Sequence, residues 1–414
     1  MTAARFNERA LLLTLAGIQF THIVDFMVMM PLGPYFTRLF GISDAQFGLL
    51  VSAYTLSAGL SGLCASLFID RFERKRLLLW MYAGFALATL ACGLAPGYTL
   101  LLAARIAAGL FGGVMGNLVQ TIVADAIPFE RRGAAMGVVM SAFALSTVAG
   151  VPGSLWLAEA WGWHAPFIGI ALASGVIRVV GWHVLPLVDA HLQAARDRAP
   201  LQALQSVLRE PNHWRAWTLT ALIMGSGFTT IPFLTLYLTS NLGLREAQMP
   251  LVYLAGGVAT LFTPRLIGAA ADRWGKAVVF RAVATAAMLP ILAVTHLGPV
   301  PLPVVLVVTT LFFVLVSGRF VPAMALITAS VVPALRGTFM SLNGAVQSIA
   351  MGLASLLGGL LVGRDAQGLM TGYAACGWVS VGLTLAALAW VGRLRLADAG
   401  PGPAAGLQMG QPAR

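Results

Sequence analysis

The chain of 414 residues is 58% hydrophobic and only 10% charged, with a mean hydropathy of +0.84. A soluble domain carries about a quarter charged residues, so this composition excludes a soluble globular fold and makes lipid the expected solvent. The net charge of +11 does not indicate a nucleic-acid partner, because arginine and lysine fall in short clusters between apolar segments. Cys64, Cys92 and Cys376 lie inside apolar runs and have neither disulfide nor metal-binding spacing.

Twelve apolar runs are long enough to cross a bilayer, which takes roughly 20 residues per helix. Their hydrophobicity is continuous rather than alternating, which favours helices over the strands of a barrel. The first run follows Arg5 and Arg9, but no small-residue cleavage site closes it, so it is predicted to be an uncleaved span. The predicted all-α membrane fold has its spans at 10–36, 45–69, 77–96, 98–124, 133–158, 165–187, 215–240, 247–270, 277–297, 303–331, 337–362 and 370–392.

Basic residues set the expected orientation of these spans. With the N-terminus inside, nineteen lysines and arginines fall on the inner side, and only Arg38, Arg245 and Arg364 fall in outer loops. Because cytoplasmic loops carry the excess of basic residues, both termini are predicted to lie in the cytoplasm, with the chain in the plasma (inner) membrane.

Two short stretches far apart in the chain are nearly alike: residues 66–75 (SLFIDRFERK) and 268–276 (GAAADRWGK). Each follows one apolar run and precedes another, about half the chain apart, which predicts two equivalent six-helix halves. The predicted organisation is an N-terminal half at 1–187, a cytoplasmic linker at 188–214, a C-terminal half at 215–395 and a disordered tail at 396–414. For the linker, a short amphipathic helix between Pro200 and Pro211 and a plain flexible segment both remain open.

The paired stretches resemble the Gly-x-x-x-Asp-Arg-x-Gly-Arg/Lys loop that follows the second and eighth helices of the major facilitator superfamily. The second copy matches at every fixed position, whereas the first has Ser66 and Glu73 where glycines are usual. Further similarity lies in PFERRG at 128–133, PALRG at 333–337 and RIAAG at 105–109 in the fourth span. The resemblance covers essentially the whole chain, and it is to the drug:proton antiporter and arabinose-type sugar efflux branch of that superfamily.

This resemblance implies a gate on the cytoplasmic side. Each loop aspartate would face a helix N-terminus of the other half, so we expect Asp70 to meet Arg336 and Asp272 to meet Arg132 when that side closes. The alternative is that these charges only enforce topology. The remaining charged residues of the predicted gate are Arg71, Arg74, Arg273 and Lys276.

Charges within a span are costly and are by default functional hypotheses. Asp25 is the only acid well inside an apolar run, and at 1.5 Å per residue it and Arg105 reach similar depths from opposite ends of their helices. An ion pair between Asp25 and Arg105 would avoid the cost of burying either charge without a partner. His22 lies one turn from Asp25 on the same helix face. The resemblance to drug:proton antiporters, with an acid in the first helix, favours Asp25, Arg105 and His22 as a proton-coupling site. A fixed ion pair that locks helices together is the alternative.

A central substrate cavity is predicted from polar side chains interleaved with aromatic residues and methionine. Such a lining suits an adaptable, largely apolar ligand, although ordinary packing explains the same residues. The predicted lining residues are Gln19, Phe26, Met29, Asn117, Gln120, Phe228, Thr229, Asn343 and Gln347. Arg178 and Arg319 either meet an anionic group of the substrate, or snorkel and bond backbone carbonyls at broken helices.

These features predict a secondary active transporter that exports a small organic compound, drug-like or sugar-like, by alternating access and in exchange for protons. An uptake symporter, a facilitated-diffusion carrier and a non-transporting membrane sensor remain as alternatives. The spans hold no convergent nucleophile, base or metal cluster, and no phosphate-binding Gly-x-x-x-x-Gly-Lys loop is present, so we expect neither an enzyme nor a metal, nucleotide or other cofactor. The expected partners are the substrate, protons and membrane lipid, with the protein as a monomer.

Overall fold

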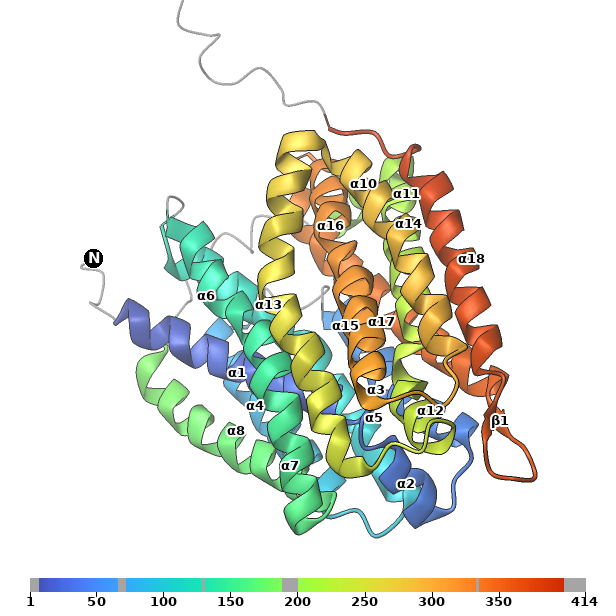
Figure 1. Ribbon diagram of the computed structural model, residues 1–414. Coiled ribbons are helices and arrows are strands. Elements are labelled where there is room, and N and C mark those ends of the chain that lie inside the picture. Colours follow the sequence, from blue (N-terminus) through green and yellow to red (C-terminus); the bar gives the residue numbers. More distant parts are fainter. Residues whose placement is uncertain (1–6, 66–71, 129–130, 188–199, 333–334, 398–414) are drawn as a thin grey trace, which may run out of the picture.

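The computed structural model describes residues 7–65, 72–128, 131–187, 200–332 and 335–397. Within these residues, twelve helices are long and apolar enough to cross a membrane. Their number and their order along the chain confirm the predicted all-α fold with two six-helix halves (Figure 1). In the described residues the only strands form one short antiparallel hairpin.

The N-terminal half contains α1 (Glu8–Val28), α2 (Gly33–Phe40), α3 (Asp44–Ala65), α4 (Arg74–Gly93), α5 (Tyr98–Ala126), α6 (Arg132–Leu145), the π-helical turn η3 (Ser146–Gly150), α7 (Val151–Trp161) and α8 (His164–Val184). The segment before the C-terminal half holds α10 (Pro200–Arg209). The C-terminal half contains α11 (Pro211–Phe228), η4 (Ile231–Phe233), α12 (Leu234–Ser240), η5 (Glu246–Gln248), α13 (Met249–Trp274), α14 (Lys276–Thr295), α15 (Leu302–Gly318), α16 (Phe320–Ala329), α17 (Arg336–Leu361), β1 (Gly363–Arg364), β2 (Met370–Thr371) and α18 (Tyr373–Val391).

Prolines divide the first span of each half near the same end of the bundle. The predicted run 10–36 is two helices, because α1 ends at Val28 and the chain turns through Pro31 before α2 begins. In the seventh span, the turn η4 carries Pro232 between α11 and α12. Proline lacks the backbone N–H that continues a helix, which explains both interruptions. The two short helices that follow, α2 and α12, pack against each other.

Twelve crossings place the start of α1 and the end of α18 at one end of the bundle, which we call the termini end; the β1–β2 hairpin lies at the opposite, hairpin end (Figure 1). The halves pack through α3 against α17 and through α7 and η3 against α13. Backbones come close at these contacts: a Cβ added to Gly48 would lie 3.0 Å from the Cα of Gly359, and one added to Gly257 would lie 2.8 Å from the carbonyl oxygen of Thr147. Toward the termini end, α6 and α13 diverge (Figure 1).

Close helix approach within the N-terminal half depends on Gly109 of α5. A Cβ added there would collide with the backbone carbonyl oxygen of Tyr54 in α3, whereas a Cβ on Gly116, seven residues later in the same helix, would meet nothing within 4 Å. We expect Gly109→Ala to force the two helices apart and to destabilise the protein by about 1–3 kcal/mol, the range for overpacked sites. Thermal unfolding in detergent should show a lower midpoint for Gly109→Ala and an unchanged midpoint for Gly116→Ala; equal midpoints would contradict this account of α3–α5 packing.

Candidate functional site: a buried ion pair between the helices of the N-terminal half

The predicted contact between Asp25 of α1 and Arg105 of α5 is present. Arg105 Nη1 donates to Asp25 Oδ2 at 2.9 Å, and both side chains are fully buried, with 0% exposure. Thr89 of α4 donates to the other carboxylate oxygen at 3.1 Å. Three helices therefore meet at one carboxylate, whose negative charge is balanced by a cation that has no access to water.

Tyr54 of α3 completes the surroundings of the cation. Its ring centroid lies 4.3 Å from the Arg105 guanidinium carbon, within the range of a cation–π interaction. The Nε and Nη2 atoms of Arg105 are buried and have no hydrogen-bond partner within the described residues. Sequence reasoning missed both Tyr54 and Thr89, because a tyrosine and a threonine inside apolar runs are indistinguishable from packing residues until the helices are placed.

His22 lies beside this cluster, as its position one turn before Asp25 predicts. Its ring is 5.7 Å from the ring of Phe85 and 6.3 Å from that of Tyr54. Both ring nitrogens are buried and, like the Tyr54 hydroxyl, find no hydrogen-bond partner among the described residues. The two side chains converge over Gly112, where a Cβ would lie 2.8 Å from both His22 Nε2 and the Tyr54 hydroxyl oxygen.

Five of the predicted lining residues are partly exposed, and some lie directly between the halves. Phe26 stacks on Phe228 of the opposite half at 5.9 Å, and Asn117 Nδ2 donates to the Ser341 hydroxyl of the opposite half at 3.4 Å. The five partly exposed residues are Gln19, Phe26, Asn117, Phe228 and Gln347, and Gln120 is fully exposed.

Three other predicted lining residues are buried. Met29 is 1% exposed within a hydrophobic cluster. Thr229 donates to the Gly225 carbonyl at 2.7 Å, and Asn343 accepts a hydrogen bond from Thr220 at 2.7 Å. The polar groups of Thr229 and Asn343 are therefore engaged inside the C-terminal half rather than presented between the halves.

Arg178 and Arg319 have partners within their own halves. Arg178 Nε donates to the Leu79 carbonyl at 3.2 Å, between α8 and α4. Arg319, 1% exposed, lies at the break between α15 and α16 and donates to the carbonyls of Val316 and Ile223 and to the Thr384 hydroxyl at 3.2, 3.4 and 2.9 Å. This geometry matches the alternative of backbone carbonyls at a broken helix.

The residues predicted for the gate lie at the termini end, where Asp70 and Arg71 fall outside the described residues. Arg74 pairs with Asp125 at 2.5 Å within the N-terminal half. Arg132 Nε donates to the Ile127 carbonyl at 2.9 Å. No hydrogen bond or ion pair joins Arg132 to Asp272 in the part of the chain that the structure describes. Because α6 and α13 diverge here (Figure 1), a contact that forms only on closure stays a prediction, as do gate roles for the neighbouring Arg273, Lys276 and Arg336.

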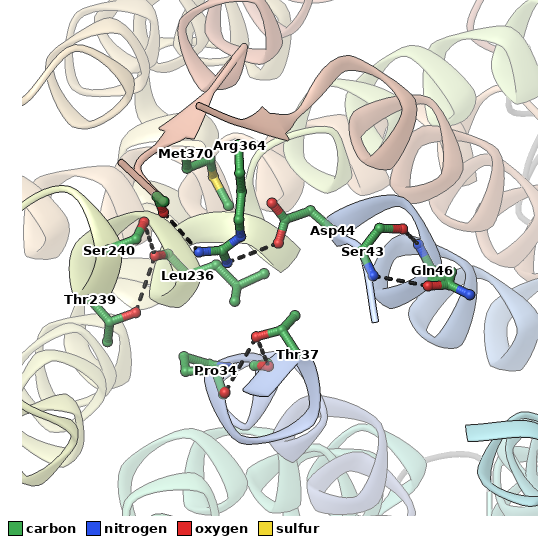
Figure 2. A network of polar contacts seen from close by, with 12 residues as sticks. Pro34, Thr37, Ser43, Asp44, Gln46, Leu236, Thr239, Ser240, Arg364 and Met370 are labelled. Atoms are coloured by element: carbon green, nitrogen blue, oxygen red, sulfur yellow. Dashed lines mark hydrogen bonds and ion pairs between the residues drawn. The ribbon is translucent and has the colours of Figure 1, made fainter. Parts of the chain in front are cut away.

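At the hairpin end, two ion pairs join the halves in opposite senses. Arg38 of the N-terminal half contacts Glu246 of the C-terminal half at 2.6 Å, and Arg364 of β1 contacts Asp44 at the start of α3 at 3.0 Å. Figure 2 shows Arg364 reaching across to Asp44. Arg38, Glu246 and Arg364 line an open pocket of about 530 Å³. Sequence reasoning counted Arg38 and Arg364 only as outer-loop charges; the signal it missed is that an acid stands at the start of the second and of the eighth span.

The β1–β2 hairpin is itself fixed to the seventh span. Asn241 Nδ2 donates to the Met370 carbonyl and Asn241 Oδ1 accepts from the Met370 N–H, both at 2.9 Å. Arg364 also donates to the Gly368 carbonyl at 3.1 Å. The arginine that crosses to the N-terminal half therefore projects from an anchored hairpin.

Twelve apolar helices in two halves that are joined at the hairpin end, with α6 and α13 diverging at the termini end, indicate a multi-pass membrane protein of the transporter class. The chain belongs to the Major Facilitator Superfamily, whose family model matches residues 15–355. The uncharacterized MFS-type transporter YceJ of Bacillus subtilis is 24% identical over 364 residues, covering 87% of this chain and 91% of the relative. The chloramphenicol resistance protein of Streptomyces lividans is 27% identical over 356 residues, covering 84% of this chain and 86% of the relative.

The fold is also that of solved transporters. A bacterial homologue of the human lysosomal transporter Spinster, in an inward-facing and unoccupied conformation, matches with a TM-score of 0.72 at 17% sequence identity, covering 95% of each chain. At this level of identity the likeness concerns the fold alone.

Proposed function

We propose that this protein is a secondary active exporter that moves a small organic compound out of the cell in exchange for protons. It acts in the plasma (inner) membrane, with the termini end in the cytoplasm, and its two halves rock to expose a central site to either side. The arrangement described above, with the halves joined at the hairpin end and α6 and α13 diverging at the termini end, is then the inward-facing one. The observation that carries the proposal is the fully buried Asp25–Arg105 pair.

The pair is suited to coupling because its two charges depend on each other. A carboxylate and a guanidinium at 0% exposure are tolerated only while they neutralise one another, and removing one partner of a buried pair costs about 3–5 kcal/mol. Protonation of Asp25 therefore leaves a buried cation without its counter-charge and favours any arrangement in which Arg105 gains water or another acceptor. The protonation state of one carboxylate thus biases the equilibrium between two conformations.

The proposed exchange cycle uses the two protonation states of Asp25 in turn. In the inward-facing arrangement Asp25 is paired, which is the state after its proton has left to the cytoplasm, and the substrate then binds from the same side. After rocking outward, the substrate leaves and Asp25 takes up a proton from outside. The empty, protonated transporter then returns to the inward-facing arrangement and releases the proton to the cytoplasm, which re-forms the pair with Arg105. Inward proton flow then drives outward substrate flow, with no other energy source or cofactor in the cycle.

The side chains between the halves and the names of the relatives support the proposed substrate class. The partly exposed residues there are amides and aromatic rings without charge, which suit a neutral, largely apolar compound. The relative named as a chloramphenicol resistance protein makes that antibiotic, an uncharged aromatic compound, a rational first substrate.

Proteoliposomes with an imposed pH gradient test the proposal. Radiolabelled chloramphenicol is added outside vesicles whose lumen is either acidic or alkaline, with protein-free vesicles as the control for passive entry. Antiport predicts that the acidic lumen drives accumulation several-fold above the level without a gradient, and that an ionophore collapsing the gradient abolishes the excess. Accumulation driven instead by an alkaline lumen would identify a symporter, and flux insensitive to both gradients would identify a facilitated-diffusion carrier.

A further inference from the structure

Four described residues of the N-terminal half, in the region of the ion pair, carry buried polar atoms without a partner, and three of them, His22, Tyr54 and Arg105, lie together at the ion pair. Within the described residues, the Gln19 carbonyl oxygen, both His22 ring nitrogens, the Tyr54 hydroxyl and two Arg105 nitrogens are buried and form no hydrogen bond. A buried polar group left unsatisfied costs about 1–3 kcal/mol, and native proteins rarely carry several at one place. Such a cluster indicates that a hydrogen-bonding ligand group belongs there.

The absence of a side chain at Gly112 of α5 lets the side chains of His22 and Tyr54 approach each other. Both His22 Nε2 and the Tyr54 hydroxyl oxygen lie 2.8 Å from the point that a Cβ of Gly112 would occupy. Any other residue at position 112 would displace them. Neither donates to or accepts from the other, so each keeps its hydrogen-bonding capacity for a third group.

The aromatic rings of Phe26 and Phe228 lie beside these polar groups. The Phe26 ring stacks on Tyr54 at 5.5 Å and on Phe228 of the opposite half at 5.9 Å, and both phenylalanines are partly exposed. Gln19, His22 and Phe26 are spaced at three and four residues and so share one face of α1. A flat apolar group lying against Phe26 would therefore place a polar substituent next to His22 and Tyr54.

The charge balance selects an uncharged ligand. Asp25 and Arg105 neutralise one another and are sealed at 0% exposure, so neither is available to bind an ionic group. Aside from them, the groups here are the Tyr54 phenol and the His22 imidazole, with the Gln19 amide about one turn away on α1, and together they offer both donors and acceptors.

We propose that His22 and Tyr54, seated on Gly112, bind a hydroxyl or amide group of a neutral aromatic substrate whose ring lies against Phe26 and Phe228. The site rests on the proposed transport function and specifies its substrate: an uncharged aromatic compound with a hydrogen-bonding substituent. Tyr54 then contacts both the substrate and Arg105, the ion-pair partner of the proton-binding Asp25, and so links the substrate site to the coupling site.

Equilibrium dialysis of the purified full chain tests the site without any gradient. The probes are 4-nitrophenyl β-D-glucopyranoside, a neutral aromatic compound with four hydroxyls, and its tetra-O-methyl ether, which keeps the ring and loses every O–H donor. We expect the glucoside to bind more tightly than the ether. Tyr54→Phe, which removes one hydroxyl, should weaken glucoside binding about three- to tenfold and weaken ether binding less, because the ether oxygens can accept a hydrogen bond but cannot donate one. Gly112→Ala should cause a similar loss by displacing both side chains.

The matched control is Tyr82→Phe. Tyr82 is a buried tyrosine of the same half whose hydroxyl is hydrogen-bonded to Thr21 at 2.8 Å, so its loss should not change binding of either probe. Equal binding of the two probes, failure of the glucoside to bind, or a Tyr54→Phe variant that binds it normally would each overturn the proposal. A Tyr54→Phe variant that binds normally but no longer responds to a pH gradient would assign Tyr54 to coupling alone, overturning this site while sparing the proposed function. If both probes bind as expected but flux does not respond to a pH gradient, the site stands and the proposed proton-coupled function is overturned.

Discussion

Asp25→Asn is expected to abolish accumulation driven by a pH gradient. Asparagine has nearly the same shape as aspartate and can still accept from Thr89, but it carries no charge in either state of the cycle. The protonation step that shifts Arg105 between paired and unpaired states is then lost. In proteoliposomes with an acidic lumen, accumulation should fall to the level seen without a gradient, while downhill flux persists at a reduced rate.

The single variant leaves Arg105 as a buried, unpaired cation, which by itself is expected to destabilise the fold. The double variant Asp25→Asn/Arg105→Gln removes both charges and separates coupling from stability: it should fold, carry downhill flux and remain insensitive to the gradient. Thr89→Val, which keeps the ion pair and removes only the 3.1 Å hydrogen bond, is the control expected to retain gradient-driven accumulation. If the double variant still accumulated substrate in response to the gradient, the pair would be a structural lock between helices.

Arg364→Ala is expected to open the hairpin end. Asp44 is buried, with a side-chain exposure of 1%, and Arg364 is its ion-pair partner across the interface. Loss of the arginine leaves a buried carboxylate without a counter-charge in the joined arrangement, which therefore loses stability relative to one in which the halves separate and Asp44 meets water. Because Arg364 is itself 37% exposed, the effect is smaller than for a fully buried pair; we expect at least a tenfold shift in the equilibrium, about 1.4 kcal/mol.

A cysteine at position 236 reports this opening. Leu236 is 1% exposed and lies against α2 of the opposite half, so Leu236→Cys should react with a membrane-impermeant maleimide only when the halves part. The native exposed Cys64 is replaced by serine, whereas Cys92 and Cys376 are buried and can stay. Arg364→Ala should raise the labelling rate at least tenfold.

Arg38→Ala is the matched control at the other cross-half pair. With 67% of the Arg38 side chain exposed, its contact with Glu246 is screened by water and is worth about 1 kcal/mol or less. When Arg38→Ala is combined with Leu236→Cys, the rate of maleimide labelling at position 236 should rise by no more than a few-fold. Equal rates in Arg364→Ala and the parent protein would show that the hairpin-end ion pairs do not hold the halves together.

The spans and the buried pair could both be predicted from the sequence, because each depends on a quantity that is local along the chain. Insertion of a helix into lipid depends on the summed hydrophobicity of about 20 consecutive residues, so twelve spans can be read from local composition. Depth along a helix is also a linear quantity, at 1.5 Å per residue, and it placed Asp25 and Arg105 at a common level before any packing was known. The proline interruptions of the first and seventh spans are likewise local effects.

Other features depended on which helix faces meet. Arg319 satisfies its donors inside the C-terminal half, and Thr229 and Asn343 turn inward rather than toward the opposite half, because rotation of a helix about its axis is set by its neighbours. The contact between the Tyr54 ring and Arg105 depends on the close approach of α3 and α5, which the sequence alone does not show.

The sequence by itself therefore determined that this chain crosses a membrane twelve times in two related halves and carries one acid–base pair at a common depth. Only the tertiary structure decided that Arg38 and Arg364 join the halves at the hairpin end, and that the side chains of His22 and Tyr54 converge over Gly112 beside the pair. The physical reason is that the free energy of inserting a helix into lipid is a sum over residues that are consecutive in the sequence. An ion pair between residues 44 and 364, or a tyrosine resting on a glycine of another helix, exists only through contacts that no local sum contains.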